Sequence, residues 1–157
     1  MGWPSEPAAS PATRDVFVVH GRADGPKQAV ARFLTKLELR PIILHEQPSQ
    51  GRTIIEKFEA HTTVAFAIVL VTPDDEGRHR GEPELSPRAR QNVIWEWGYL
   101  VAKLGRERVC ALYSSGTELP SDLNGVAWVE MDAAGAWQLE VARELRAVNV
   151  AVDTNEL

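Results

Sequence analysis

The sequence has one cysteine and lacks a long apolar run, a surplus of basic residues and clustered histidines. Cys110 is the only cysteine among the 157 residues, which excludes an intrachain disulfide and a zinc site built on cysteines. A chain without disulfides fits a reducing compartment and predicts a cytoplasmic protein. We expect no metal site, because neither HxxxH nor HxH spacing occurs among the four histidines: His20, His45, His61 and His79.

Net charge and hydropathy exclude two further classes of partner. The formal charge is −5 and the isoelectric point is about 5.4, whereas a nucleic-acid binder usually has a basic surplus. The longest apolar run, residues 64–71, is far shorter than the roughly 20 residues that cross a bilayer. Residues 1–13 lack the apolar segment of a signal peptide. We therefore expect neither a membrane segment nor a nucleic-acid partner.

The chain divides into a short tail and one domain. Residues 1–13 are rich in proline, alanine and serine, and Pro4, Pro7 and Pro11 interrupt regular structure. This segment is either a flexible tail or the end of a linker to an upstream sensor domain, and both interpretations remain open. Residues 14–157 have the length and the apolar content of a single domain with a sizeable core.

Strand and helix patterns alternate along that domain. The strongest strand is residues 64–71, an unbroken apolar run typical of a parallel strand that is buried on both faces. Other strands are expected at 16–19, 41–44, 108–113 and 126–131, and helices at 26–37, 54–61, 87–104 and 137–148. This alternation predicts an α/β fold, with a flavodoxin-like, doubly wound parallel five-stranded sheet in the strand order 2-1-3-4-5.

Three helix starts have local signals. Pro26 is expected at a first helical position. Thr53 and Glu56 form a capping-box pattern at the start of the second helix. Ser86 and Pro87 are read as the N-cap and first-turn proline of the third helix, after a loop over residues 73–87.

The third helix has a carboxylate on the flank of its core face. Placed at 100° steps, Asn92, Glu96, Tyr99 and Lys103 form a stripe beside the apolar side. Glu96 is therefore expected at an edge, neither fully buried nor plainly outward. No cation lies three or four residues away from it, so an ion pair within the helix is excluded, although a partner from another element remains open. Trp95 points away from the core and is either covered by a loop or a contact between protomers.

Four stretches of the sequence resemble a known family: VFVVHGR (16–22), ILHEQPSQGRTIIE (43–56), VLVTPDD (69–75) and RARQNVIWEWGY (88–99). They are similar to the TIR-like, predicted nucleotide-binding domain of bacteria, which is fused to cyclic-nucleotide sensors in anti-phage effectors such as TIR-STING. The resemblance covers about residues 15–157. Trp95, Trp97 and the Asp24–Gly25–Pro26 segment depart from the family pattern.

The resemblance implies an NAD⁺ glycohydrolase (NAD⁺ nucleosidase) that is switched on by self-association through TIR–TIR contacts. Its catalytic glutamate falls on Glu96, which would stabilise a ribosyl cation. The TIR gating loop, which also contacts a neighbouring protomer, falls on Gln47, Gln50, Gly51 and Arg52, with Trp95 added as a contact. NAD⁺ is the substrate, and no cofactor is expected.

The loops after strands 1, 2 and 3 would supply the substrate contacts, since ligands of such sheets bind beyond the carboxyl ends of the strands. His45 is read as a packed histidine at the end of strand 2. The predicted substrate-binding residues are Gly21, Arg22, Glu46, Asp74, Asp75 and Asn92, each of which could instead be an ordinary turn or solvated residue. Hydrolysis and cyclisation both remain open. A non-catalytic signalling scaffold and a nucleoside 2-deoxyribosyltransferase-like enzyme are the alternative functions.

Overall fold

The structure is a computed structural model that describes residues 13–46, 50–61, 63–122, 125–155 and 157. Residues 1–12 of the expected tail lie outside the described residues. The elements follow in the order β1 (Asp15–Val19), α1 (Asp24–Lys36), β2 (Arg40–Ile42), the short 3-10 helix η1 (Leu44–Glu46), α2 (Ile54–Ala60), β3 (Phe66–Val71), β4 (Asp75–Gly77), β5 (Ser86–Arg88), α3 (Gln91–Leu104), the 3-10 helix η2 (Arg106–Arg108), β6 (Val109–Tyr113), β7 (Ala127–Glu130) and α4 (Trp137–Ala147).

The main sheet has five parallel strands in the order β2-β1-β3-β6-β7. Counted within this sheet alone, the order is 2-1-3-4-5, which confirms the predicted flavodoxin-like topology. β3 lies at the centre and is buried along its whole length, as its apolar run predicts. The chain reverses its direction of winding between β1 and β3, so a ligand site is expected at the carboxyl ends of these two strands.

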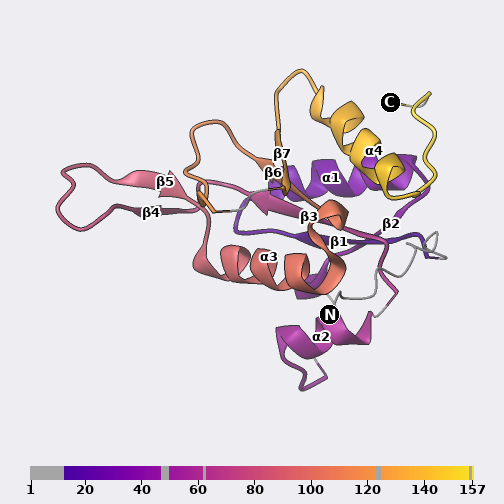
Figure 1. Cartoon of the computed structure of the whole chain (residues 1–157), viewed down its shortest axis with the longest axis horizontal. Coiled ribbons are helices and arrows are strands. Elements are labelled where there is room, and N and C mark those ends of the chain that lie inside the picture. Colours follow the sequence, from indigo (N-terminus) through magenta and orange to yellow (C-terminus); the bar gives the residue numbers. More distant parts are fainter. Residues whose placement is uncertain (1–12, 47–49, 62, 123–124, 156) are drawn as a thin grey trace, which may run out of the picture.

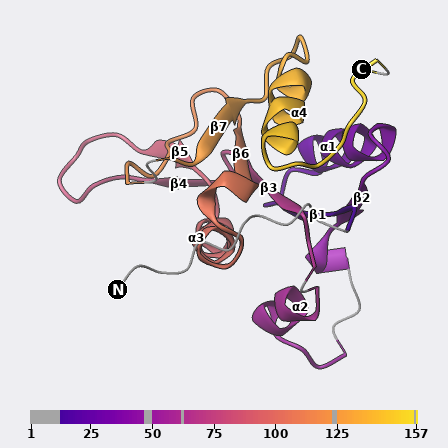
Figure 2. The same cartoon turned by 45° about the vertical axis from the view of Figure 1, so that its right-hand side comes forward.

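Helices cover both faces of the sheet, with α1 and α4 on one side and α2 and α3 on the other (Figures 1 and 2). Alternate residues of β1 enter the two layers: Val16 and Val18 pack with α1 and α4, and Phe17 and Val19 pack with α2 and α3. This period of two is the geometric consequence of a strand whose side chains point to opposite faces. β3 therefore carries apolar residues at every position, and β1 does so from Val16 to Val19.

Residues 73–87 do not form a simple loop, which corrects the sequence-based expectation. They include an antiparallel pair, β4 and β5, that projects from the body as an arm (Figure 1). Ser86 and Pro87 belong to β5, so they are not the start of the third helix, and α3 begins at Gln91 after Arg90. Pairing with β4, and the bond from the Glu118 amide to the Pro87 carbonyl at 2.8 Å, hold this segment extended.

Two other helix starts give different outcomes. The capping box is confirmed: the Thr53 side chain accepts from the Glu56 amide, and the Glu56 carboxylate accepts from the Thr53 amide. The prediction for Pro26 is wrong, because α1 begins two residues earlier at Asp24. Proline fits any position of the first turn, where backbone amides lack helical partners, so its presence does not define the first residue.

Within the described part of the chain, none of the helices combines the length and the apolar character required to traverse a bilayer.

Candidate functional site

The carboxyl ends of three neighbouring strands bring the candidate residues together. His20 and Gly21 follow β1, the turn η1 follows β2, and Thr72 begins the segment after β3. Glu96 reaches this edge from α3, which packs against β3 and β1. The site therefore combines segments that are separated by up to 76 residues in the sequence, all placed by the parallel sheet.

Glu96 is almost completely enclosed, with 3% of its surface exposed. This corrects its expected place at an edge: Glu96 is buried together with Val93, Trp97 and Leu100 of α3, and His45 Nε2 lies 3.4 Å from Glu96 Oε1. His45 is the only ionisable side chain within ion-pair distance of Glu96 among the described residues. The open question of a partner from another element is thereby answered. A carboxylate in such surroundings is costly to bury unless it is paired, which marks the position as a candidate for function.

The ring of His45 packs against the ring of a second histidine, His20. The rings of His20 and His45 meet edge to face, with centroids 5.5 Å apart. His20 Nδ1 lies 2.8 Å from the Gly21 carbonyl, and because a carbonyl only accepts, this nitrogen carries the proton. Burial lowers the pKa of His20 below its ordinary value. His20 is therefore neutral near pH 7, and its buried Nε2 has no hydrogen-bond partner in the described structure.

Glu46 lies in η1 and not at the end of strand 2, because β2 ends at Ile42. Its carboxylate is 2.7 Å from the ammonium of Lys27, which also lies 2.9 Å from Asp24. The Lys27 side chain is only 12% exposed. Hydrogen bonds to Glu46 and Asp24 raise the pKa of Lys27. Glu46 thus anchors η1 to the first turn of α1, a contact that competes with its predicted role in substrate binding.

Gly21 and Asp74 are in direct contact. A Cβ atom at position 21 would overlap the Asp74 carboxylate, so a larger residue requires the Asp74 side chain to move. The Thr72 hydroxyl donates to Asp74 Oδ2 at 2.7 Å and fixes that side chain. Two of the predicted substrate-binding residues are therefore adjacent at the switch between β1 and β3.

The other predicted substrate-binding residues are more peripheral. Arg22 is exposed, and Asp75 is half-buried in β4. Asn92 lies one turn before Glu96 on α3, but its side chain is exposed. Of the predicted substrate-binding residues, these three are therefore the more peripheral, whereas Gly21 and Asp74 lie in contact.

The expected gating loop follows η1 directly. Gln50, Gly51 and Arg52 are exposed, and Gln50 and Gly51 have positive φ angles of 47° and 72°. Gln47 lies outside the described residues.

Trp95 is 49% exposed, in agreement with its predicted outward direction. Its ring stacks on Tyr99 with centroids 6.1 Å apart. It also lines a cavity of about 460 Å³ between α3 and the segment after β6, together with Ile94, Leu119 and Pro120. This apolar hollow flanks α3 and is separate from the contact between Glu96 and His45.

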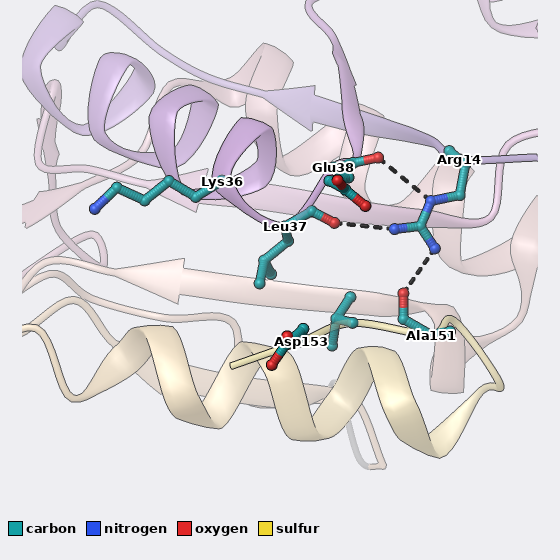
Figure 3. Close-up of a pocket in the computed structure, with 7 residues that line it drawn as sticks. Arg14, Lys36, Leu37, Glu38, Ala151 and Asp153 are labelled. Atoms are coloured by element: carbon teal, nitrogen blue, oxygen red, sulfur yellow. Dashed lines mark hydrogen bonds between the residues drawn. The ribbon is translucent and has the colours of Figure 1, made fainter. Parts of the chain in front are cut away.

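A cavity of about 690 Å³ lies at the other end of the sheet, before β1 and β2 (Figure 3). Its central side chain is Arg14, whose guanidinium donates to the carbonyls of Leu37, Glu38 and Ala151. Arg14 therefore ties the end of α1 to the C-terminal segment. These bonds use the charged group for structure, and the cavity lacks the enclosed carboxylate found at the opposite edge.

Sequence reasoning missed the roles of His45 and Lys27 in building this edge. His45 was expected only to pack, and Lys27 was not considered. The i, i+3 spacing of Asp24 and Lys27 was the one available signal, but it indicates only a helical ion pair. In the described residues, no group of three or more His, Cys, Asp or Glu side chains is arranged to hold a metal ion.

The family described as "CAP12/Pycsar effector protein, TIR domain" matches residues 15–133. The chain belongs to this family. The match includes β1 to β7 and every candidate residue discussed above, so the five-stranded sheet is that of a TIR domain.

Three relatives extend the comparison. YuaY of Escherichia coli K12 is 46% identical over 153 residues, which cover 96% of this chain and 51% of YuaY. Protein tirC of Dictyostelium discoideum is 36% identical over 125 residues, 73% of this chain and 62% of tirC. The Pycsar effector protein PaPycTIR of Pseudomonas aeruginosa is 44% identical over 66 residues, 41% of this chain and 21% of that protein. This TIR domain thus spans about half of YuaY and less than two thirds of tirC.

Proposed function

We propose that this TIR domain cleaves NAD⁺ at its N-glycosidic bond, with Glu96 as the catalytic carboxylate. The observation that carries the proposal is the enclosed Glu96 side chain, which has a histidine as its ionisable neighbour and lies at the ligand edge of the sheet. The membership of the chain in the CAP12/Pycsar TIR family supports the same assignment.

The chemistry requires little acid catalysis. The nicotinamide of NAD⁺ is cationic, so when the bond from the ribose carbon to nitrogen breaks, the electron pair neutralises the ring and a neutral base leaves. The ribose carbon then develops positive charge, which the Glu96 carboxylate stabilises in a site of low dielectric constant. Water forms the new bond to that carbon and releases one proton, giving ADP-ribose. Attack by the adenine instead of water would give a cyclic product.

The same edge offers groups for the rest of the substrate. Asp74 lies against Gly21, where a sugar hydroxyl could donate to its carboxylate. Arg22, exposed after β1, is a cation suited to a diphosphate. Asp75 and Asn92 at the rim would contact the substrate only after closure of the neighbouring loops.

We further propose that the domain is the effector part of an anti-phage defence protein and that self-association activates it. Relatives of this chain are named Pycsar effector protein and CD-NTase-associated protein 12, and this chain covers only part of their length. A sensor of a cyclic nucleotide in the remaining part of such a protein would control assembly. Residues 50–52 and Trp95 are exposed on the surface and are the proposed contacts between protomers.

Nicotinamide release at increasing protein concentration tests this function. We expect turnover per protomer to rise with concentration, and Glu96→Gln to abolish it while the protein stays folded. Glu140→Gln is the matched control, because Glu140 is an exposed carboxylate on α4, across the sheet. Full activity in Glu96→Gln would refute the assignment, as would the absence of nicotinamide release from an assembled wild-type protein.

A non-catalytic scaffold is the second candidate, and the half-exposed Trp95 beside an apolar cavity favours it. An exposed tryptophan leaves a large apolar surface in water, and contact with another protein would bury that surface. This function predicts assembly that depends on Trp95 without any loss of NAD⁺. The concentration series above, combined with sedimentation of Trp95→Ala, separates the two functions.

A further inference from the structure

We propose that His45 is a positioning residue that orients the Glu96 carboxylate toward the ribose. This inference rests on the proposed function and adds to it a group that does not itself touch the substrate. Its basis is the contact between η1 and α3, where His45 Nε2 and Glu96 Oε1 are 3.4 Å apart.

Glu96 depends on a partner from outside its helix. The positions three and four residues away on α3 are occupied by Asn92, Val93, Tyr99 and Leu100, none of them cationic. A buried carboxylate without a donor pays a large desolvation cost and can rotate among several orientations. A donor on one oxygen removes both problems. With Oε1 facing His45, the second oxygen, which has no ion-pair partner among the described residues, is the one left for a sugar hydroxyl.

His45 is held in a way that suits this task. Leu44, the residue before it, is 2% exposed and packs in the layer of α2 and α3. Glu46, the residue after it, is tied to Lys27 at 2.7 Å. The His20 ring packs against the His45 ring, and His20 is itself fixed by the Gly21 carbonyl. The ring is therefore restrained on three sides, although 43% of the side chain remains exposed.

At 3.4 Å, His45 Nε2 and Glu96 Oε1 lie within ion-pair distance, but the two atoms do not form a hydrogen bond in this structure, which contains no substrate. Hydrogen bonds in a catalytic site are often long without substrate and shorten when the reacting complex forms.

Substitution of His45 separates positioning from packing. His45→Ala removes the donor, and we expect kcat for nicotinamide release to fall about 10- to 100-fold with little change in KM, the range typical for loss of a partner that orients a functional ligand. His45→Gln retains an N–H donor of similar reach, and we expect it to recover most of kcat. His79→Ala, on the exposed arm, is the matched control and should behave as wild type.

A second measurement does not depend on activity. The ring ¹⁵N shifts of His45 report which nitrogen carries the proton. We expect the Nε2–H form in the wild-type protein, and a mixture of both neutral forms in Glu96→Gln, because the amide no longer selects a donor. Ring shifts that are identical in the two proteins would overturn the proposal, and so would a His45→Gln protein as slow as His45→Ala at equal stability.

The outcomes distinguish this inference from the proposed function. If Glu96→Gln is inactive and His45→Ala keeps the wild-type kcat, the positioning role fails and the function stands. If the assembled wild-type protein releases no nicotinamide, the function fails and the positioning role falls with it.

Discussion

At the residue scale, the contact between Gly21 and Asp74 decides how closely β1 and the segment after β3 approach. A side chain at position 21 is disfavoured because its Cβ atom would overlap the Asp74 carboxylate. The φ angle of Gly21 is not positive, so the backbone itself does not require glycine. Sequence reasoning found both residues but could not place them in contact. The contact joins residues 53 positions apart, and only the parallel pairing of β1 with β3 brings them together.

Replacement of Gly21 by alanine tests this contact. We expect Gly21→Ala to lower the free energy of unfolding by about 1–3 kcal/mol, the range for overpacking in a closely packed site. Urea denaturation measures the change. Gly25→Ala is the control, because a Cβ atom there meets nothing within 4 Å and alanine suits a helix better than glycine. Equal stability of the Gly21→Ala and wild-type proteins would contradict the account.

The buried imidazole of His20 gives a second residue-scale prediction. Its pKa is lowered by burial, so between that pKa and 6.5 the unfolded chain binds a proton that the folded chain does not. The free energy of unfolding must then fall as pH is lowered through this window. His20→Asn keeps a donor for the Gly21 carbonyl but does not titrate, so its decline between pH 7 and pH 5 should be shallower. The urea midpoint at each pH measures this decline. Equal declines in the two proteins would show that folding does not lower the pKa of His20.

The same scale shows what sequence could reveal about the candidate site. The helical period predicted Glu96 beside the core face of α3, but in the structure it is buried together with Val93, Trp97 and Leu100. Sequence reasoning could not predict this burial, because the contact with His45 comes from another part of the chain. His45 and Lys27 were missed for the same reason: their partners lie 51 and 19 residues away.

At the element scale, the local signals for helix starts gave different outcomes. The Thr53–Glu56 capping box formed as expected, because both of its bonds lie within four residues. The Ser86–Pro87 signal failed, because this segment pairs with β4 and the Pro87 carbonyl accepts a hydrogen bond from the Glu118 amide. A local signal can therefore be overridden when a strand pairs with the same backbone, as it does at Ser86 and Pro87.

The capping box offers a test on α2. Thr53→Ala removes the side-chain acceptor, and we expect a loss of about 0.5–2 kcal/mol, with faster amide hydrogen exchange concentrated in residues 54–60. Glu56→Gln preserves the reciprocal bond and should have a much smaller effect. Uniform acceleration of exchange across all helices, or none at all in α2, would argue against a local capping role.

At the scale of the whole molecule, the alternation of apolar strands and amphipathic helices was sufficient to predict the sheet order. Two layers of helices on a parallel sheet admit few connections, and right-handed crossovers restrict them further. The projecting arm, β4–β5, was not predicted, because its polar residues lack the apolar alternation that marks a half-buried strand. The strand order of the main sheet was thus easier to predict than the β4–β5 arm.

Assembly is also a property of the whole molecule. If Trp95 contributes to contacts between protomers, Trp95→Ala should weaken self-association and lower turnover at dilute protein, while saturating protein restores it. Analytical ultracentrifugation alongside the nicotinamide assay follows both quantities. The exposed Leu139 on α4 provides a control, since Leu139→Ala removes an apolar side chain of equal exposure from the opposite layer. Identical effects of the two substitutions would mean that Trp95 has no special place in assembly.

The position of bound substrate tests the central claim most directly. A structure of the Glu96→Gln protein with NAD⁺ should show the nicotinamide ribose against residue 96, beyond the carboxyl ends of β1 and β3 and next to His45. A ribose bound instead in the Arg14 cavity or in the hollow beside Trp95 would contradict the account.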